Sequence, residues 1–187
     1  MDINKIIAKK ELEVIGGKPK VFRYWDEKEK KSIDIMSCID RPYTGVMSCA
    51  TIGLSEYDIG MLSDNKKLRL ELLGACDVTE ELFPNIVSTT AFEIMERDNC
   101  GYGNIIPNVI QQYIYDCEMK HVYLVNPFLW NGFKSIEFEN RKVAWLLIIP
   151  ISNEEKDYAL VNGWNALETK FEEADIDIFN LRRKSIV

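Results

Sequence analysis

An uninterrupted apolar run at residues 143–149 constrains the fold more than any other feature of this chain. A run of strand length without a polar face must be covered on both sides, as in the interior of a sheet. Pro150 follows the run, and Ser152 then precedes Glu155 by three residues, the spacing of a capping box that begins a helix. These residues predict a buried strand that ends at Pro150, followed by two short helices separated at Asn162 and Gly163.

Several β-rich segments predict further strands. Residues 21–25 and 32–36 flank a charged stretch, which indicates a strand pair joined by a solvated turn. Residues 69–75 alternate charged and apolar side chains, so we expect a half-exposed strand that is limited by Gly74. Other strands are expected at residues 46–54, 121–125, 136–139 and 143–149.

The N-terminal residues predict a short helix. An imperfect apolar stripe over residues 3–15 stops at Gly16 and Gly17, which indicates a lead-in helix and a hinge within residues 1–17. The chain contains no internal repeat, low-complexity tract or long linker. We therefore expect residues 1–187 to form a single domain.

A second helical region is expected in the middle of the chain. Thr79 can cap a helix that begins at Glu80, and apolar positions at helical spacing indicate a longer helix over residues 86–98. Because proline interrupts helical hydrogen bonding, Pro84 is expected to divide the two.

Composition and charge exclude several classes of protein. With 47% apolar and 11% aromatic residues, the 187-residue chain is too apolar to be a disordered acidic protein. Its net charge of −7 argues against direct nucleic-acid binding, which needs clustered lysine and arginine. The acidic excess favours a basic partner, although it also fits the ordinary requirement for solubility.

The cysteines and the N-terminus indicate a cytoplasmic protein. Five cysteines are an odd number without a CxxC pair, which favours neither a disulfide framework nor a zinc site. Charges interrupt the apolar residues at the N-terminus, unlike a signal peptide, and the run at residues 143–149 is too short to cross a bilayer. We expect a soluble cytoplasmic protein without a membrane anchor.

Three motifs resemble catalytic or phosphate-binding elements but have structural explanations. His121, the one histidine, follows Cys117 by four residues, yet a nucleophilic pair also needs an orienting group and an oxyanion site. The glycine-rich loop at residues 101–104 lacks the preceding strand and the lysine of a phosphate-binding loop. Paired carboxylates such as Glu154 and Glu155 suit a solvated first helical turn. No catalytic, cofactor or metal site is predicted.

Two surface features are candidates for binding a partner. An acidic series of residues lies on the short segment from Glu168 to Asp177, where Leu167, Phe171 and Ala174 can take the buried face of a helix so that the carboxylates point outward. A plain solvated face is the alternative interpretation. The candidate partner-binding residues are Glu168, Glu172, Glu173, Asp175 and Asp177. A second group, Phe128, Trp130 and Phe133, is either a partner anchor or a lid over the core, and we favour the lid.

Three groups of residues resemble motifs of the Suppressor of Fused-like family. The C-terminal third matches its signature of strand, Pro-Ile-Ser, Glu-Glu, Asn-Gly, Ala-Leu and Ile-Asp-Ile before Arg182. Residues 51–55 read Thr-Ile-Gly-Leu-Ser, and residues 127–130 follow a Pro-Phe-x-Trp pattern. The resemblance runs from about Thr51 to Val187, and the first fifty residues contribute little. It implies an α/β (α+β) fold in which helices pack a mixed, mainly antiparallel sheet.

The resemblance also implies a function. Domains of this family act by binding proteins, and small bacterial members occur as immunity proteins or antitoxins beside polymorphic toxins, including LXG-type toxins with nuclease domains. We therefore expect stoichiometric neutralisation of a cognate toxin, with a basic nuclease domain as the partner, and no cofactor. The alternatives are a general intracellular protein-interaction module and, third, a hydrolase that uses Cys117 and His121.

Overall fold

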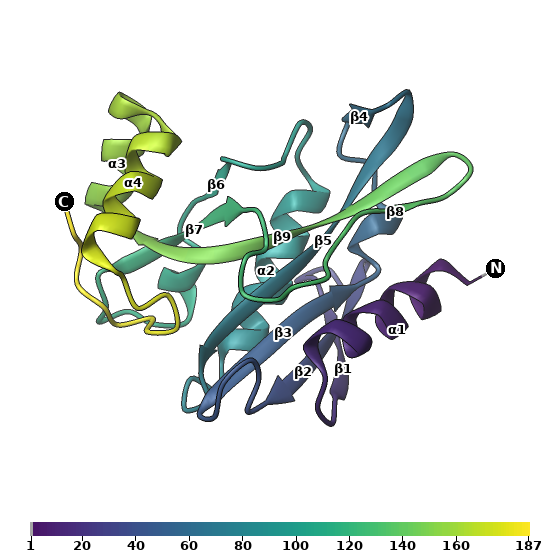
Figure 1. The fold of residues 1–187 in the computed structure, drawn as a ribbon, viewed down its shortest axis with the longest axis horizontal. Helices are drawn as coiled ribbons and strands as arrows, with labels where there is room; N and C mark the ends of the chain where they lie inside the picture. Colours follow the sequence, from purple (N-terminus) through teal and green to yellow (C-terminus); the bar gives the residue numbers. More distant parts are fainter. Residues whose placement is uncertain (1) are drawn as a thin grey trace.

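The computed structural model describes residues 2–187, and its strands form one nine-stranded sheet (Figure 1). The strands are β1 (Lys20–Trp25), β2 (Ser32–Ile39), β3 (Val46–Ile52), β4 (Leu62–Ser63), β5 (Lys66–Asp77), β6 (Ile105–Ile106), β7 (Met119–Val125), β8 (Ile136–Glu137) and β9 (Arg141–Ser152). They lie in the order β1-β2-β3-β5-β9-β7-β6, with β4 beside β5 and β8 beside β9. Within the described residues only β5 and β9 run parallel, which confirms the mainly antiparallel sheet.

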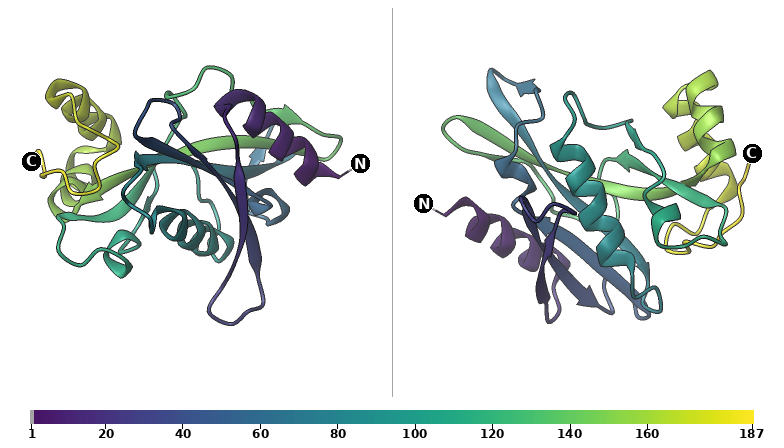
Figure 2. Two further views of the ribbon diagram at one scale, coloured as in Figure 1. Left: turned by 90° about the horizontal axis from the view of Figure 1, so that it is seen from below. Right: turned by 180° about the vertical axis from the view of Figure 1, so that it is seen from behind.

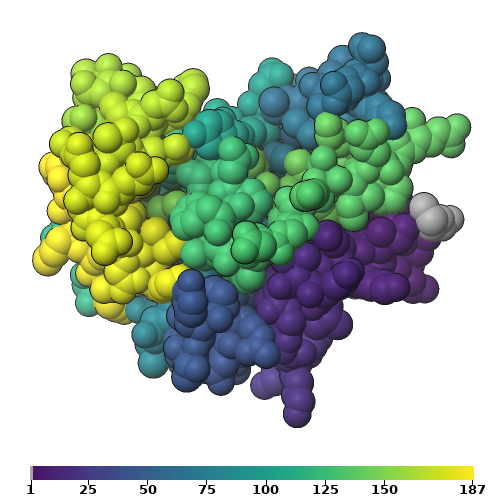
Figure 3. All heavy atoms as spheres, viewed as in Figure 1, coloured from purple at the N-terminus to yellow at the C-terminus, as the bar shows by residue number. Residues whose placement is uncertain are grey.

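Helices cover both faces of the sheet (Figures 1 and 2). The helices are α1 (Ile3–Ile15), α2 (Phe83–Met95), α3 (Asn153–Asn162) and α4 (Trp164–Ala174), with short 3-10 turns η1 (Leu54–Glu56) and η2 (Ile110–Gln112). One apolar core includes α2 and η2, and the other includes α1, α4 and the opposite face of β9. The C-terminal segment covers one end of the α1 face (Figure 3).

Strand β9 is longer than the sequence predicts. It continues through Pro150, which pairs with Val122 of β7, and ends at Ser152 instead of at the proline. Proline is tolerated because pairing with β5 stops at Leu147, so no neighbouring carbonyl on that side needs the missing N–H donor. The strand therefore delivers Ser152 directly to the start of α3.

Strand β5 is buried, contrary to the half-exposed strand predicted at residues 69–75. It lies between β3 and β9 with helices over both faces, so even Arg69 and Glu71 have little or no exposed surface. Gly74 does not limit the strand, which runs on to Asp77. A Cβ atom at Gly74 would lie 2.8 Å from the Phe83 ring, so the glycine permits close packing of α2 on the sheet.

The middle helix also begins differently from the prediction. Helix α2 starts at Phe83 and ends at Met95, and residues 79–82 form a turn in which Thr79 contacts Asp77. Pro84 does not divide two helices. It lies in the first turn of α2, where backbone N–H groups have no helical acceptor and proline therefore costs little.

The predicted N-terminal helix and hairpin are confirmed. Helix α1 ends where Gly16 adopts a positive φ of 74° and its N–H donates to Leu12, as expected for a glycine C-cap. Strands β1 and β2 pair antiparallel around the charged turn. The segment at residues 51–55 ends β3 and turns through Gly53, whose φ of 110° suits glycine.

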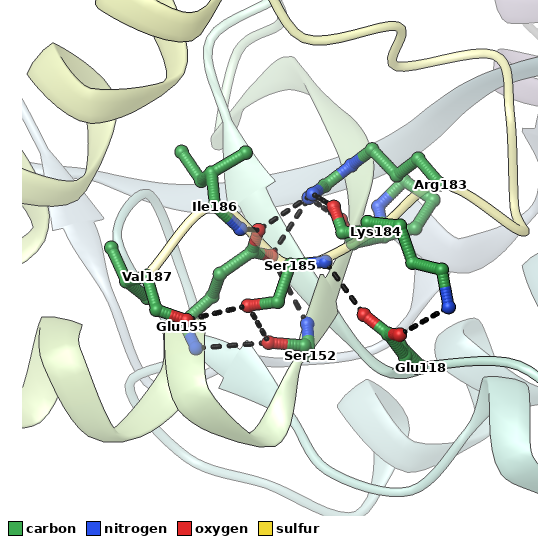
Figure 4. A network of polar contacts seen from close by, with 9 residues as sticks. Glu118, Ser152, Glu155, Arg183, Lys184, Ser185, Ile186 and Val187 are labelled. Carbon is green, nitrogen blue, oxygen red and sulfur yellow. Dashed lines mark hydrogen bonds and ion pairs between the residues drawn. The ribbon is translucent and has the colours of Figure 1, made fainter.

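A buried ion pair fixes the C-terminal segment to the end of β9 (Figure 4). The two terminal nitrogens of Arg183 lie 2.6 and 2.7 Å from the two carboxylate oxygens of Glu155, and one of them also donates to the Pro150 carbonyl at 2.9 Å. Glu155 simultaneously completes the predicted capping box with Ser152. The Glu155 side chain is fully buried, not solvated as predicted, because Arg183 neutralises it from 28 residues away.

Around this ion pair, the last residues make further bonds beside the start of β7 and the end of β9. The Ser185 N–H donates to Glu118 at 2.8 Å, and the Ser185 and Ser152 hydroxyls lie 2.8 Å apart. The Ile186 N–H also reaches Glu155. The segment after α4 is therefore held by directional polar bonds as well as by apolar contacts (Figure 4).

We predict that Arg183→Ala lowers the free energy of unfolding by about 3–5 kcal/mol, because it leaves the Glu155 carboxylate buried without a partner. Urea denaturation measures the loss. Arg182→Ala is the matched control, since Arg182 makes exposed ion pairs with Glu80 and Asp116 and should cost about 1 kcal/mol or less. Adding Glu155→Gln to Arg183→Ala should restore part of the stability. Equal losses in the two arginine variants would contradict the assignment.

Two further carboxyl groups, Glu11 and Glu71, are fully buried near each other between α1 and β5. Glu71 accepts hydrogen bonds from the Thr51 hydroxyl at 2.5 Å and from three backbone N–H groups at residues 53–55. Glu11 accepts from the Trp145 indole at 2.9 Å. Burial raises the pKa of Glu71 to about 7, and burial together with the Glu71 charge raises the pKa of Glu11.

These raised pKa values predict a stability that declines as the pH rises. The folded protein binds these protons more tightly than the unfolded chain, so the stabilisation is complete below the ordinary glutamate pKa and is lost as the pH rises through about 7. Glu11→Gln removes one charge but keeps an acceptor for Trp145. We expect the stability difference between pH 5 and pH 8 to shrink by about 1 kcal/mol or more in urea titrations.

The matched control for this prediction is Glu13→Gln, which removes an exposed charge from the same helix. It should leave the pH dependence of unfolding as it is in the wild-type protein. Parallel pH profiles for Glu11→Gln and the wild-type protein would show that the two buried carboxyl groups are not coupled as described.

Candidate functional site

The two C-terminal helices form the predicted helix pair. Gly163 separates α3 from α4 with a φ of 86°, which confirms the break expected at this position. Leu167 and Phe171 face the core, as predicted, but Ala174 is exposed. Ala174 is the last residue of α4. The helix ends there because the next residue, Asp175, adopts a left-handed conformation with a φ of 46°.

A pocket of about 500 Å³ lies between α4, the segment after it and the loops flanking β6 and β7. Figure 3 shows the surface hollowed between the yellow C-terminal segment and the green centre of the molecule. The apolar part of its lining includes Val125, Ile149, Phe171, Ile176 and Ile178. Its carboxylates are Glu168, Glu172 and Asp175, so three of the five predicted site residues meet at one cavity.

Glu168 is held by two tyrosines instead of pointing freely into solvent as predicted. The Tyr102 hydroxyl lies 2.9 Å from both carboxylate oxygens, and the Tyr123 hydroxyl donates to one of them at 2.8 Å. Burial raises the pKa of Tyr123, and the Glu168 carboxylate raises it further, so the hydroxyl stays protonated as a donor. The carboxylate therefore has a fixed orientation at the pocket.

The other four predicted residues are exposed but differ in their contacts. Glu172 and Asp175 line the pocket. Glu173 makes an ion pair with Lys170 at 2.8 Å, and Asp177 accepts the backbone N–H of Phe179. The structure brings Glu173 and Asp177 to the same end of the molecule without including them in the pocket lining.

The aromatic loop after β7 is divided between core and surface. Trp130 is buried and contacts Phe133 edge to face, and Phe133 in turn lies 5.5 Å from Trp145 between ring centroids. Trp130 and Phe133 therefore form a lid over the core, as expected from the sequence. Phe128 is instead 60% exposed and lines the pocket, so it is available to a partner.

The cysteine and histidine considered for catalysis have structural contacts. The Nδ1 atom of His121 accepts the Asn108 N–H at 2.8 Å, which places the ring proton on Nε2, 2.9 Å from the side-chain oxygen of Asn153. Cys117 donates to the Met119 carbonyl, and burial raises its thiol pKa. A nucleophilic pair needs a lowered thiol pKa and a thiol–imidazole contact, so this geometry favours a structural role.

The remaining motifs give no positive evidence for a ligand. Gly103 has a φ of 84° and donates its N–H to Leu124, so the glycine-rich loop uses this group within the fold. The cysteines are buried and unpaired, and among the described residues no three His, Cys, Asp or Glu side chains are placed so that they could hold a metal ion. Between residues 2 and 187, no helix is long and apolar enough to span a membrane.

The sequence indicates the acidic residues of the pocket but not the side chains that hydrogen-bond to them. Tyr102 and Tyr123 carry no pattern that relates them to Glu168, which lies 66 and 45 residues away. The Pro-Phe-x-Trp pattern did mark Phe128. The ion pair of Arg183 with Glu155 could not be predicted either, because the sequence identifies Glu155 only as a capping residue.

Comparison with known proteins identifies the fold and a close relative. Immunity protein YqcF of Bacillus subtilis (strain 168) is 40% identical over 186 residues, covering 98% of this chain and 97% of the relative. The crystal structure of a SUFU homologue from Neisseria gonorrhoeae FA 1090 has a TM-score of 0.74 at 16% identity, covering 100% of this chain and 98% of that chain.

Two further solved structures share the fold at 12% identity. The Sufu-Fu complex has a TM-score of 0.66, with 97% of this chain and 91% of that chain covered. Drosophila Suppressor of Fused has a TM-score of 0.64, and the match covers 98% of this chain but 50% of that one.

A family model described as Suppressor of fused protein (SUFU) matches residues 29–184. The match begins earlier than Thr51, where the recognisable motifs start, so β2 and most of β3 also lie within the matched region. This chain therefore belongs to the Suppressor of fused family.

Proposed function

We propose that this protein is an immunity protein that neutralises a cognate toxin by stoichiometric binding, without catalysis. The observation that carries the proposal is the 40% identity, over nearly the whole chain, to a protein named as an immunity protein. We further propose that the toxin is of the LXG type with a basic nuclease domain, and that the two proteins meet in the cytoplasm. Free, buried cysteines suit a reducing compartment.

The proposed contact surface is the acidic C-terminal surface, defined by Glu168, Glu172, Glu173, Asp175 and Asp177. A nuclease must present cationic groups to the phosphates of its substrate. Carboxylates on a fixed helix can occupy those groups and block access to them. Opposite charges also accelerate the encounter of two proteins by roughly 10- to 1000-fold, and the chain has a net charge of −7.

The first test is co-expression with the toxin that the neighbouring gene encodes. We expect growth to be restored and a complex of fixed stoichiometry to be recovered by size-exclusion chromatography. The complex should weaken as salt is added, because screening reduces attraction between exposed charges. Continued killing by the toxin, with no complex formed, would remove the proposal.

The second test reverses charge on the proposed surface with Glu172→Lys and Glu173→Lys. We expect association with the toxin to slow by about 10-fold or more at low salt, because electrostatic steering is lost. Folding should change little, since the ion pair that is broken, Glu173 with Lys170, is exposed. Stopped-flow association rates and thermal unfolding measure the two effects.

The matched control for charge reversal is Glu27→Lys with Glu139→Lys. It changes the net charge equally, at exposed turns between β1 and β2 and between β8 and β9 (Figure 1). If both pairs slow association equally, net charge alone explains the effect. If neither pair does, the contact surface lies elsewhere, although the immunity role still stands.

A second candidate function is a general protein-interaction module, and one observation favours it. Strand β1 lies at the edge of the sheet, and its side chains Val21, Phe22 and Trp25 are at least half exposed. Edge strands with exposed apolar side chains are suited to pairing with another chain. A partner that is not a toxin, and whose binding is lost on Phe22→Ser with Trp25→Ser, would support this alternative.

A further inference from the structure

The pocket beside α4 combines an apolar floor with an acidic rim. Isoleucine, valine and phenylalanine side chains form the floor, and Glu168, Glu172 and Asp175 contribute carboxylates. Its volume of about 500 Å³ lies in the range of sites that bury a compact ligand. This combination fits a group with an apolar stem and a positive end.

The rim carboxylates have no cation of their own within the described residues. Among residues 2–187, no lysine or arginine lines the pocket. Lys170, on the same helix, pairs with Glu173 outside the lining, and the nearby Arg183 is committed to Glu155. Three carboxylates thus line an apolar cavity with no described cation of this chain among the lining residues, and their combined negative potential favours a cationic occupant.

Glu168 is prepared to accept a further hydrogen bond. The two tyrosine hydroxyls fix its orientation, but a carboxylate has about four acceptor positions and these hydroxyls do not fill them all. Both Tyr102 and Phe128 also line the cavity and offer aromatic surface. A planar cation can therefore donate to the carboxylates while it contacts an aromatic ring.

We propose that this pocket is a socket for one arginine side chain of the partner protein, with an adjacent apolar residue filling the remaining space. The identification of that partner rests on the proposed function. Arginine fits better than lysine because its planar guanidinium donates two parallel hydrogen bonds and stacks on aromatic rings. An arginine inside the fold makes the same two kinds of contact. The Cζ atom of Arg183 lies 5.4 Å from the centroid of the Phe171 ring, and its guanidinium pairs with the Glu155 carboxylate.

The socket can be tested without the toxin. The probe is the peptide acetyl-Leu-Arg-Leu-amide, added to the full chain with labelled isoleucine and valine methyl groups. We expect saturable NMR shifts at Val125, Ile149, Ile176 and Ile178. The control peptide has citrulline in place of arginine, which keeps the shape of the side chain without its charge. Its affinity should be lower by at least about 10-fold, because the charge-assisted hydrogen bonds are lost. Absent shifts, or equal affinity for both peptides, would overturn the proposal.

The second arm measures affinity for the neighbouring toxin. Glu172→Gln with Asp175→Asn removes two rim charges, and asparagine suits the left-handed backbone at residue 175. We expect this variant to weaken binding by about 10-fold or more. The control, Glu27→Gln with Glu139→Gln, removes two exposed charges outside the proposed contact surface and should weaken binding by about 2-fold or less.

The two arms separate the socket from the proposed function. Equal weakening by both variants, or no weakening by either, would overturn the claim that the partner uses the socket. If the wild-type protein does not bind the toxin, the immunity role fails, and the peptide experiment alone decides whether the pocket accepts arginine.

Discussion

The bidentate contact between Arg183 and Glu155 holds the C-terminal third of this protein in place. Glu155 serves two elements at once, because it caps α3 at Ser152 and neutralises an arginine from the last residues of the chain. Arg183 compensates the charge of the fully buried Glu155 carboxylate, and without it that charge would stay buried and unpaired. The start of α3, the segment after α4 and the end of β9 are therefore fixed relative to one another. The pocket beside α4 depends on this arrangement, because α4 and the segment after it form part of its lining.

Features encoded by neighbouring residues could be predicted from the sequence. The apolar run in β9, the capping box at Ser152 and the glycine break at Gly163 each depend on contacts within a few residues. The predicted ends of strands and helices were less accurate wherever a tertiary contact determines where the element ends. Strand β9 passes Pro150 because β5 no longer pairs there, and β5 passes Gly74 because α2 packs against it.

Long-range partners limited the prediction of the site. The acidic residues of α4 are evident from composition and helical spacing, but their environments are not. Glu168 differs from Glu173 because tyrosines from two other segments reach it. Similarly, Glu71 looks like the exposed position of an alternating strand until the sheet order places β5 between β3 and β9. A charged residue inside a strand reveals its burial only when its partners are known.

The sheet order explains why the pocket forms where it does. Because β9 lies between β5 and β7, the chain that leaves β9 through α3 and α4 returns beside the loops that flank β6 and β7. Tyr102, Phe128 and Glu168 therefore meet although they lie in three separate segments. Two of them belong to loops, where substitutions disturb the sheet least. Substitutions at the pocket rim can accordingly change its shape and charge, while the buried strands and the Arg183–Glu155 contact preserve the fold.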